Sequence, residues 1–147
     1  MIIGFATIDD FQELYTLGKN TPEFMVSATE DFMSEDEFRW SIQNPDGIFL
    51  VAKDEDKIIG FIYATTKDIE RTRVDNYSCI VYIVIRPEFR GNGIATSLYN
   101  ACVKKLKIMG ITHLYCWASA DGKEVKDFMK KQGFNEGHTY VWMDKAL

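Results

Sequence analysis

The sequence predicts an α/β domain with a mixed central sheet. Short apolar runs rich in β-branched residues alternate with amphipathic stretches of helical period along the chain. Two of those runs, 48–53 and 57–66, are separated by three acidic residues, which is typical of an antiparallel hairpin. The 147 residues, of which 46% are hydrophobic, suffice for one domain with a core, spanning 1–147.

The first third of the chain predicts one strand and two helices. Residues 2–6 form a short apolar run, and the Thr and two Asp that follow it cap a helix over 7–17, ended by Gly18. Segment 20–33 has no clean period, so we expect it to be irregular or a short helix. A second capping box, Ser-Glu-Asp-Glu, predicts a helix over 34–43.

The middle of the chain predicts a buried strand, a Gly-rich turn and a long helix. The run at 80–85 stops at Pro87, which cannot continue a sheet ladder. Apolar residues then recur every four positions over 94–109, and Gly110 is a natural helix end. The polar segment 67–76 before this unit is expected to be an exposed loop.

The end of the chain repeats the strand–helix alternation. Residues 112–118 predict a strand, and 122–132 predict the last helix, with Gly133 after its end. Residues 139–145 predict a final strand.

The Gly-rich turn offers a site for a phosphate. The first amides of a helix have no partner within the helix and together carry about half a positive charge. Gly91 and Gly93 lack the Cβ atoms that would hold a ligand away from those amides, and Arg90 flanks them. The alternative is a tight connection that binds nothing. The turn is neither a dinucleotide fingerprint nor a P-loop, because the third glycine and the Gly-Lys-Ser/Thr are missing.

Charge is distributed unevenly along the chain. Residues 1–56 carry thirteen acidic and three basic side chains, whereas 57–147 carry nine acidic and fourteen basic ones. An anionic ligand would therefore favour the second part and a cationic one the first, unless the charges merely decorate solvated faces. The net charge of −5 argues against a nucleic-acid partner.

Neither a membrane nor an oxidising compartment is expected. The sequence has no apolar run of spanning length, and its first apolar patch is interrupted by Gly4. The three cysteines, Cys79, Cys102 and Cys116, are odd in number and predict reduced thiols in a cytoplasmic protein. No cluster has the spacing of metal ligands, so we expect no metal.

The stretch from Ile83 to Ala95 resembles the signature of the GNAT superfamily of N-acetyltransferases. Ile-Val-Ile-Arg-Pro leads to Arg-Gly-Asn-Gly-Ile-Ala, which matches every fixed position of Gln/Arg-x-x-Gly-x-Gly/Ala after its strand. Phe-Met-Lys-Lys-Gln-Gly-Phe at 128–134 is similar to the family's Phe-Tyr-x-x-x-Gly-Phe. The resemblance implies a three-layer fold with a mixed sheet of about six to seven strands and roughly four flanking helices.

The resemblance also implies a co-substrate, acetyl-coenzyme A. In the family its pantetheine arm pairs with the strand before the signature, and its pyrophosphate meets the amides of the turn. The residues that carry these roles here are Ile83, Val84, Ile85, Arg90, Gly91, Asn92, Gly93, Ile94, Ala95 and Thr96. The implied reaction is direct transfer of an acetyl group to a primary amine in a ternary complex, with a backbone N–H of the strand steadying the oxyanion.

The chain departs from the family at the general acid. The usual Tyr is Met129 here, which has no transferable proton, and the family's Asn is Gly122, next to Asp121. Three explanations stay open. Another residue protonates the thiolate, no acid is required, or the protein is a non-catalytic acyl-CoA-binding sensor or interaction module.

Tyr82 is the first candidate for a replacement acid or base, because it lies on the signature strand with parity opposite to its neighbours. A core tyrosine is an equal alternative. Tyr140 on the predicted final strand is a second candidate. His113 and His138 have no partner spacing, so we expect them to be structural or exposed. Cys116 has no adjacent base, so we expect it to pack in the core.

The acidic first third predicts a cationic acceptor. It contains Glu23, Glu30, Asp31, Glu35, Asp36 and Glu37, and the family's acceptors enter over this part of the fold. A small amine, a polyamine or an amino group of a peptide fits such a rim. The protein is expected to be a monomer or a homodimer.

Overall fold

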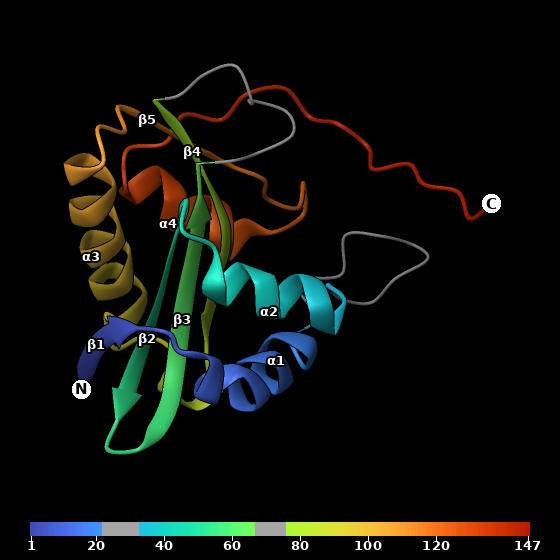
Figure 1. Ribbon diagram of the computed structural model, residues 1–147. Coiled ribbons are helices and arrows are strands. Elements are labelled where there is room, and N and C mark those ends of the chain that lie inside the picture. Colours follow the sequence, from blue (N-terminus) through green and yellow to red (C-terminus); the bar gives the residue numbers. More distant parts are fainter. Residues whose placement is uncertain (22–32, 67–75) are drawn as a thin grey trace.

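A five-stranded sheet forms the centre of the computed structural model, which describes residues 1–21, 33–66 and 76–147 (Figure 1). The strands lie in chain order, the first four are antiparallel neighbours, and the last pair is parallel. They are β1 (Ile2–Phe5), β2 (Gly47–Asp54), β3 (Lys57–Thr65), β4 (Tyr77–Ile85) and β5 (His113–Cys116).

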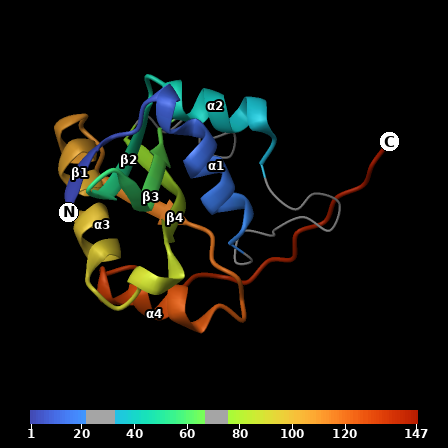
Figure 2. The ribbon, with the colours of Figure 1, turned by 90° about the horizontal axis from the view of Figure 1, so that it is seen from below.

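Helices cover both faces of this sheet and complete three layers (Figures 1 and 2). The first pair, α1 (Phe11–Lys19) and α2 (Glu35–Gln43), lies on one face. The second pair, α3 (Ile94–Ile108) and α4 (Lys123–Lys131), lies on the other. Short 3-10 turns precede α1 and α3, and no helix within the described ranges is long and apolar enough to cross a bilayer.

The two faces of the sheet bury two separate hydrophobic cores. Beneath α1 and α2, the rings of Phe38, Phe49 and Phe61 pack edge-to-face and stacked against each other. On the face covered by α3 and α4, Leu98 and Leu106 of α3 are fully buried against the aliphatic side chains of the strands. Burying such side chains contributes about 1.5–3 kcal/mol each, and this apolar burial fixes which face each helix covers.

Most predicted elements are confirmed, but the expected strand count of six to seven is too high. Residues 139–145 do not pair into the sheet; their side chains are exposed, and the end of the chain runs outward in an extended path (Figure 1). A segment rich in β-branched and aromatic residues favours an extended backbone, but a strand also needs a neighbouring strand to share its hydrogen bonds. Gly18 does not end α1, which continues to Lys19, and β5 stops at Cys116. The segments 22–32 and 67–75 lie outside the described residues.

Candidate functional site

The Gly-rich turn between β4 and α3 has left-handed backbone at both glycines. Gly91 has φ +80° and Gly93 has φ +76°, a region that costs other residues about 1–2 kcal/mol. The side-chain Nδ2 of Asn92 donates to the carbonyl oxygens of Phe89 and Arg90, at 3.1 and 3.4 Å, and so fixes the turn from within. A Cβ at either glycine would meet nothing within 4 Å, so the surface above the turn is open to a ligand.

The turn directs a set of amides outward. Gly93 caps α3, and the first N–H that bonds back into the helix is that of Ser97, which donates to the Gly93 carbonyl at 3.0 Å. The amides of residues 94–96 come before it and have no partner within the helix. The first turn of α3 contains no acidic side chain to neutralise the helix dipole. This end of α3 therefore suits a phosphate or pyrophosphate.

The part of β4 that extends beyond its pairing with β5 lies next to the turn. Parallel pairing of β4 with β5 runs only from Tyr77–His113 to Ile80–Cys116, although β4 continues to Ile85. Within the described residues, no strand pairs with residues 81–85 on that side. Alternate residues of a strand direct their backbone groups to opposite sides, and the Arg86 N–H donates to Ile59 of β3. Ile83 and Ile85 therefore offer their backbone groups to an extended ligand, and their end leads directly into the Gly-rich turn.

A β-bulge lies at the start of this part of β4, directly after its last residue pair with β5. Tyr63 of β3 pairs with Tyr82 and the next residue, Ala64, pairs with Ile80, so Val81 has no partner residue on β3. A bulge of this kind releases one residue from the ladder and bends the strand. The bend coincides with the last residue pair between β4 and β5, so the two strands separate at Val81.

A cleft of about 270 Å³ opens beside the bulge, on the face of the sheet that α1 and α2 cover. It is lined by Met33, which precedes α2, by one face of α2 and by two residues of β3; the α2 and β3 residues are Glu37, Trp40, Ser41, Tyr63 and Thr65. The β3 residues pair with Tyr82 and Cys79, which flank the bulge on either side. The cleft therefore has one carboxylate and aromatic and apolar walls. Its β3 residues lie on the strand next to Val81.

Tyr82 lies near this cleft and is held in its protonated form. Burial raises its pKa well above the ordinary tyrosine value, and the charges of Glu37 and Tyr63 raise it further. Tyr82 and Val84 point to the face of α1 and α2, while Ile83 and Ile85 pack toward α3, which confirms the predicted parity. At neutral pH the Tyr82 hydroxyl can donate a hydrogen bond, but it is not a base.

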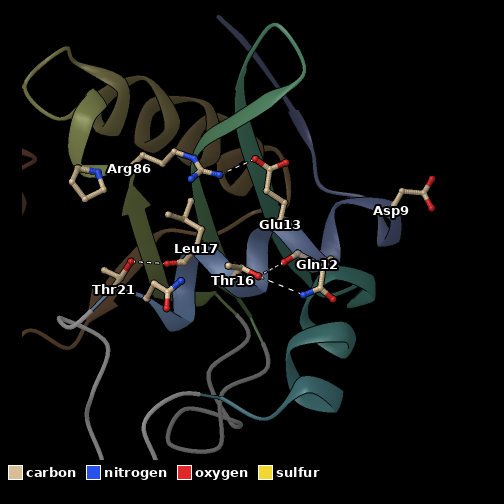
Figure 3. Close-up of a pocket in the computed structure, with 9 residues that line it drawn as sticks. Asp9, Gln12, Glu13, Thr16, Leu17, Thr21 and Arg86 are labelled. Carbon is tan, nitrogen blue, oxygen red and sulfur yellow. Dashed lines mark hydrogen bonds and ion pairs between the residues drawn. The ribbon is translucent and has the colours of Figure 1, made fainter.

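A second cleft, of about 540 Å³, lies between α1 and the end of β4 (Figure 3). Glu13 and Arg86 point toward one another across it, with Oε1 and Nη2 2.8 Å apart, while Asp9 points away. Glu13 also accepts from the Ile58 N–H at 3.0 Å, and Arg86 donates to the Ile58 carbonyl. These bonds join α1, β3 and the end of β4, so we interpret the pair as structural.

The remaining predicted site residues lie elsewhere. Tyr140 is 73% exposed near the end of the chain, where its ring meets Trp117 at 6.4 Å. Met129 is buried in the core beneath α4. Burial raises the pKa of the Cys116 thiol, which suits packing rather than nucleophilic attack. His113 stacks on Tyr77 with ring centroids 4.6 Å apart.

Sequence reasoning missed the bulge and the α2 cleft. The strand 77–85 is apolar nearly throughout, so its pattern contains no break in alternation to mark Val81. Trp40 reads as one more amphipathic-helix residue, and only the pairing of β3 with β4 brings its helix to the bulge. Glu23, Glu30 and Asp31 of the predicted acidic rim lie outside the described residues.

The chain was compared with known proteins and families. The model of the acetyltransferase (GNAT) family matches residues 2–134. An uncharacterized N-acetyltransferase of Methanocaldococcus jannaschii is 28% identical over 99 residues, which are 67% of this chain and 44% of that relative. This chain thus matches less than half the length of that protein.

Solved structures share the whole fold at low sequence identity. The PaiA N-acetyltransferase of Thermoplasma acidophilum, in complex with coenzyme A, superposes with a TM-score of 0.73 at 19% identity, covering 95% of this chain and 92% of that one. The aminoglycoside N-acetyltransferase AAC(6')-Iy, in complex with CoA, gives 0.78 at 16% identity and covers 99% and 100%. The three-layer α/β arrangement is therefore the fold of these enzymes.

Proposed function

This chain belongs to the acetyltransferase (GNAT) family, and from that premise we propose that it transfers an acetyl group from acetyl-CoA to a primary amine. The observation that carries the proposal is the continuity of two binding features. The part of β4 beyond its pairing with β5, where Ile83 and Ile85 face away from β3, runs directly into the amide cradle of the Gly-rich turn. An extended arm that ends in a pyrophosphate has the shape and charge for both.

The residues of this chain fit acetyl-CoA in two places. Backbone groups of Ile83 and Ile85 would pair with the amides of its pantetheine arm, and the amides of residues 94–96 would hold its pyrophosphate. Hydrogen bonds to charged groups contribute about 1.5–3 kcal/mol each. Two CoA complexes among the structures of similar fold support this assignment.

The bulge would position the chemistry. Acetyl-CoA supplies the acetyl group as a thioester, whose carbonyl oxygen gains negative charge as an amine attacks. The N–H of Val81, released from the β3 ladder, is the donor we assign to that charge. Tyr82 follows it and keeps its proton at neutral pH, so its hydroxyl is the donor we assign to the departing sulfur in place of Met129.

The α2 cleft would receive the amine. Glu37 supplies one carboxylate for an ammonium group, and the half-exposed Trp40 ring offers a face on which a cation or an apolar body can lie. Glu35 and Asp36 occupy the same first turn of α2 and would attract cations toward the mouth. A small cationic amine or an amino group on a peptide therefore fits, and the aminoglycoside N-acetyltransferase of similar fold supports an amine acceptor.

A second candidate function rests on Met129. A buried methionine stands where the family's usual proton donor would be, so the chain would also suit an acyl-CoA-binding module without turnover. Thiol release separates the two functions. The purified chain, acetyl-CoA and a panel of amines, polyamines and peptides should give free thiol in step with acetylated amine. Tight binding with no turnover across the panel would favour the binding module.

Substitution of Glu37 tests the assigned acceptor cleft. Glu37→Gln removes the charge and keeps the shape, so we expect KM for the amine to rise about fivefold, equivalent to about 1 kcal/mol, with little change in kcat. Glu35→Gln is the matched control, because it removes a charge from the same helical turn outside the cleft lining. Equal effects of both substitutions would mean that only the general field matters and would remove the cleft assignment.

A further inference from the structure

A buried tyrosine in the lining of the α2 cleft keeps one hydrogen that no described residue accepts. Tyr63 is 2% exposed and lines the cleft from β3. Its hydroxyl oxygen accepts from Nδ2 of Asn44 at 3.0 Å, and among the described residues none accepts the hydroxyl hydrogen in return. A buried donor without a partner is costly, so this hydrogen favours a ligand that can accept it.

Asn44 fixes the direction of this hydrogen bond. Its Oδ1 accepts from the Asp46 N–H at 3.0 Å, so its Nδ2 is turned toward Tyr63. The same Nδ2 donates to Oγ1 of Thr65 at 3.2 Å. Because an amide nitrogen can only donate, the Tyr63 oxygen can only accept from it, and the phenol hydrogen must point to another group.

The ring of Tyr63 is held in place as well as its oxygen. It stacks on the Phe49 ring with the centroids 5.2 Å apart. The hydroxyl of Ser41, which also lines the cleft, donates back to the carbonyl oxygen of Glu37 at 3.0 Å. Tyr63 is therefore a fixed, buried donor that shares one small cleft with the Glu37 carboxylate, and a donor held in place discriminates between ligands better than a mobile one.

We propose that Tyr63 selects acceptor amines that carry an oxygen on the carbon next to the one that bears the nitrogen. The Glu37 carboxylate receives the ammonium group, and the Tyr63 hydroxyl donates to the oxygen. At about 270 Å³ the cleft is below the usual range for drug-sized ligands, so few bonds separate the nitrogen from the oxygen. The inference rests on the proposed acetyl transfer and deepens it, because it names the class of amine.

Two kinds of molecule carry an oxygen in this position. In a vicinal amino alcohol or amino ether it is a hydroxyl or ether oxygen, and at the N-terminus of a peptide it is the carbonyl oxygen of the first residue. Each of these oxygens accepts a hydrogen bond. An amine with an apolar chain would leave the Tyr63 hydrogen unpaired, so the cleft should discriminate against it.

Matched pairs of amines test the proposal. 2-Methoxyethylamine and butylamine have the same chain length and differ by one oxygen, and glycinamide and isobutylamine are the corresponding pair for a peptide N-terminus. Selectivity is the ratio of kcat/KM for the oxygen-bearing amine to that for its apolar partner. Comparing this ratio between wild type and variant cancels the intrinsic reactivity of the amines.

Two substitutions remove the donor in different ways. Tyr63→Phe deletes the hydroxyl, whereas Asn44→Asp keeps the size of the side chain but offers Tyr63 a carboxylate oxygen that accepts its hydrogen. Each should lower the selectivity about tenfold. Tyr99→Phe is the matched control, because Tyr99 is a buried tyrosine of α3 in the core on the other face of the sheet, and its substitution should leave the selectivity unchanged.

Each outcome decides the proposal. Loss of selectivity in both variants but not in the control supports it, and the amine pair with the larger loss identifies the source of the oxygen. Turnover with the same selectivity in Tyr63→Phe and wild type overturns it and leaves the acetyl transfer intact.

A chain without turnover is tested by titrating each amine into its CoA-bound form, with selectivity taken as the ratio of Kd values. Selectivity that depends on Tyr63 would then support the class of amine and refute the transfer. Selectivity that is unchanged by Tyr63→Phe, or no binding of any of the four amines, would overturn the proposal.

Discussion

The charge of residue 96 offers a sharp test of the phosphate cradle. Thr96 is exposed in the first turn of α3, three residues after the Gly93 cap. Thr96→Glu adds a negative charge that the helix dipole favours by about 0.3–1 kcal/mol, so the fold should be kept or slightly stabilised. The same charge would face the pyrophosphate of CoA. The substitution therefore separates ligand binding from folding, because its two effects have opposite signs.

The expected size follows from Coulomb's law. At a separation of about 6 Å and an effective dielectric constant between about 40 and 80, each pair of charges repels by roughly 0.7–1.4 kcal/mol. Two phosphate charges double this to roughly 1.4–2.8 kcal/mol, which raises the Kd for CoA about 10- to 100-fold.

Isothermal titration at fixed ionic strength measures the effect, with Thr96→Gln as the uncharged control of the same length. A melting curve without ligand verifies that neither substitution unfolds α3. Equal affinities for the Glu and Gln variants would refute the assignment of the pyrophosphate to these amides. A high-salt repeat should narrow the difference, because salt screens exposed charges.

Three further predictions follow from the same geometry. Tyr82→Phe should lower kcat about 10- to 100-fold in a thiol-release assay and leave the Kd for CoA unchanged. Because burial raises the Tyr82 pKa, a pH profile of the wild-type rate should show no fall from deprotonation of Tyr82 below pH 10. Burial alone would raise the pKa of Asp10, but its 2.6 Å bond to Lys53 lowers it, so Asp10→Asn should cost about 1 kcal/mol at pH 7 and nearly nothing at pH 2, measured by urea unfolding. Gly93→Ala should lower stability by about 1–2 kcal/mol in the same assay, because φ is +76° there.

The sign of the Asp10 prediction follows from linkage. The carboxyl has a lower pKa folded than unfolded, so its contribution is present above the unfolded value near 3.8 and is lost as pH falls through the folded value. Urea unfolding at pH 7 and pH 2 brackets that window. A constant difference between the wild type and Asp10→Asn at both pH values would contradict the electrostatic explanation.

Local chemistry made the strand–turn–helix unit predictable. Pro87, the two glycines and the four-residue recurrence from Ile94 act within a few positions of one another, so the sequence alone locates β4, the turn and α3. The glycines also have left-handed φ angles, which other residues adopt only at a cost and which the sequence analysis did not predict.

Features that depend on distant pairing were not predictable. The bulge at Val81 exists only relative to the register of β3, and the α2 cleft exists only because β3 brings Tyr63 and Thr65 beneath α2. The predicted strand at 139–145 was wrong for the same reason. The β-branched and aromatic side chains of this segment favour an extended backbone, but nothing in the nearby sequence specifies which strand the segment pairs with.

Hydrogen–deuterium exchange with and without acetyl-CoA tests the central claim most directly, because the claim concerns particular backbone amides. Bound acetyl-CoA should slow exchange at residues 81–85 of β4 and at residues 91–96 of the turn by more than it slows exchange in β1. Saturation at about 100 times the Kd should also raise global stability by about 2.7 kcal/mol. Protection confined to other elements, or none at all at millimolar acetyl-CoA, would contradict the assignment of the cofactor to this strand and turn.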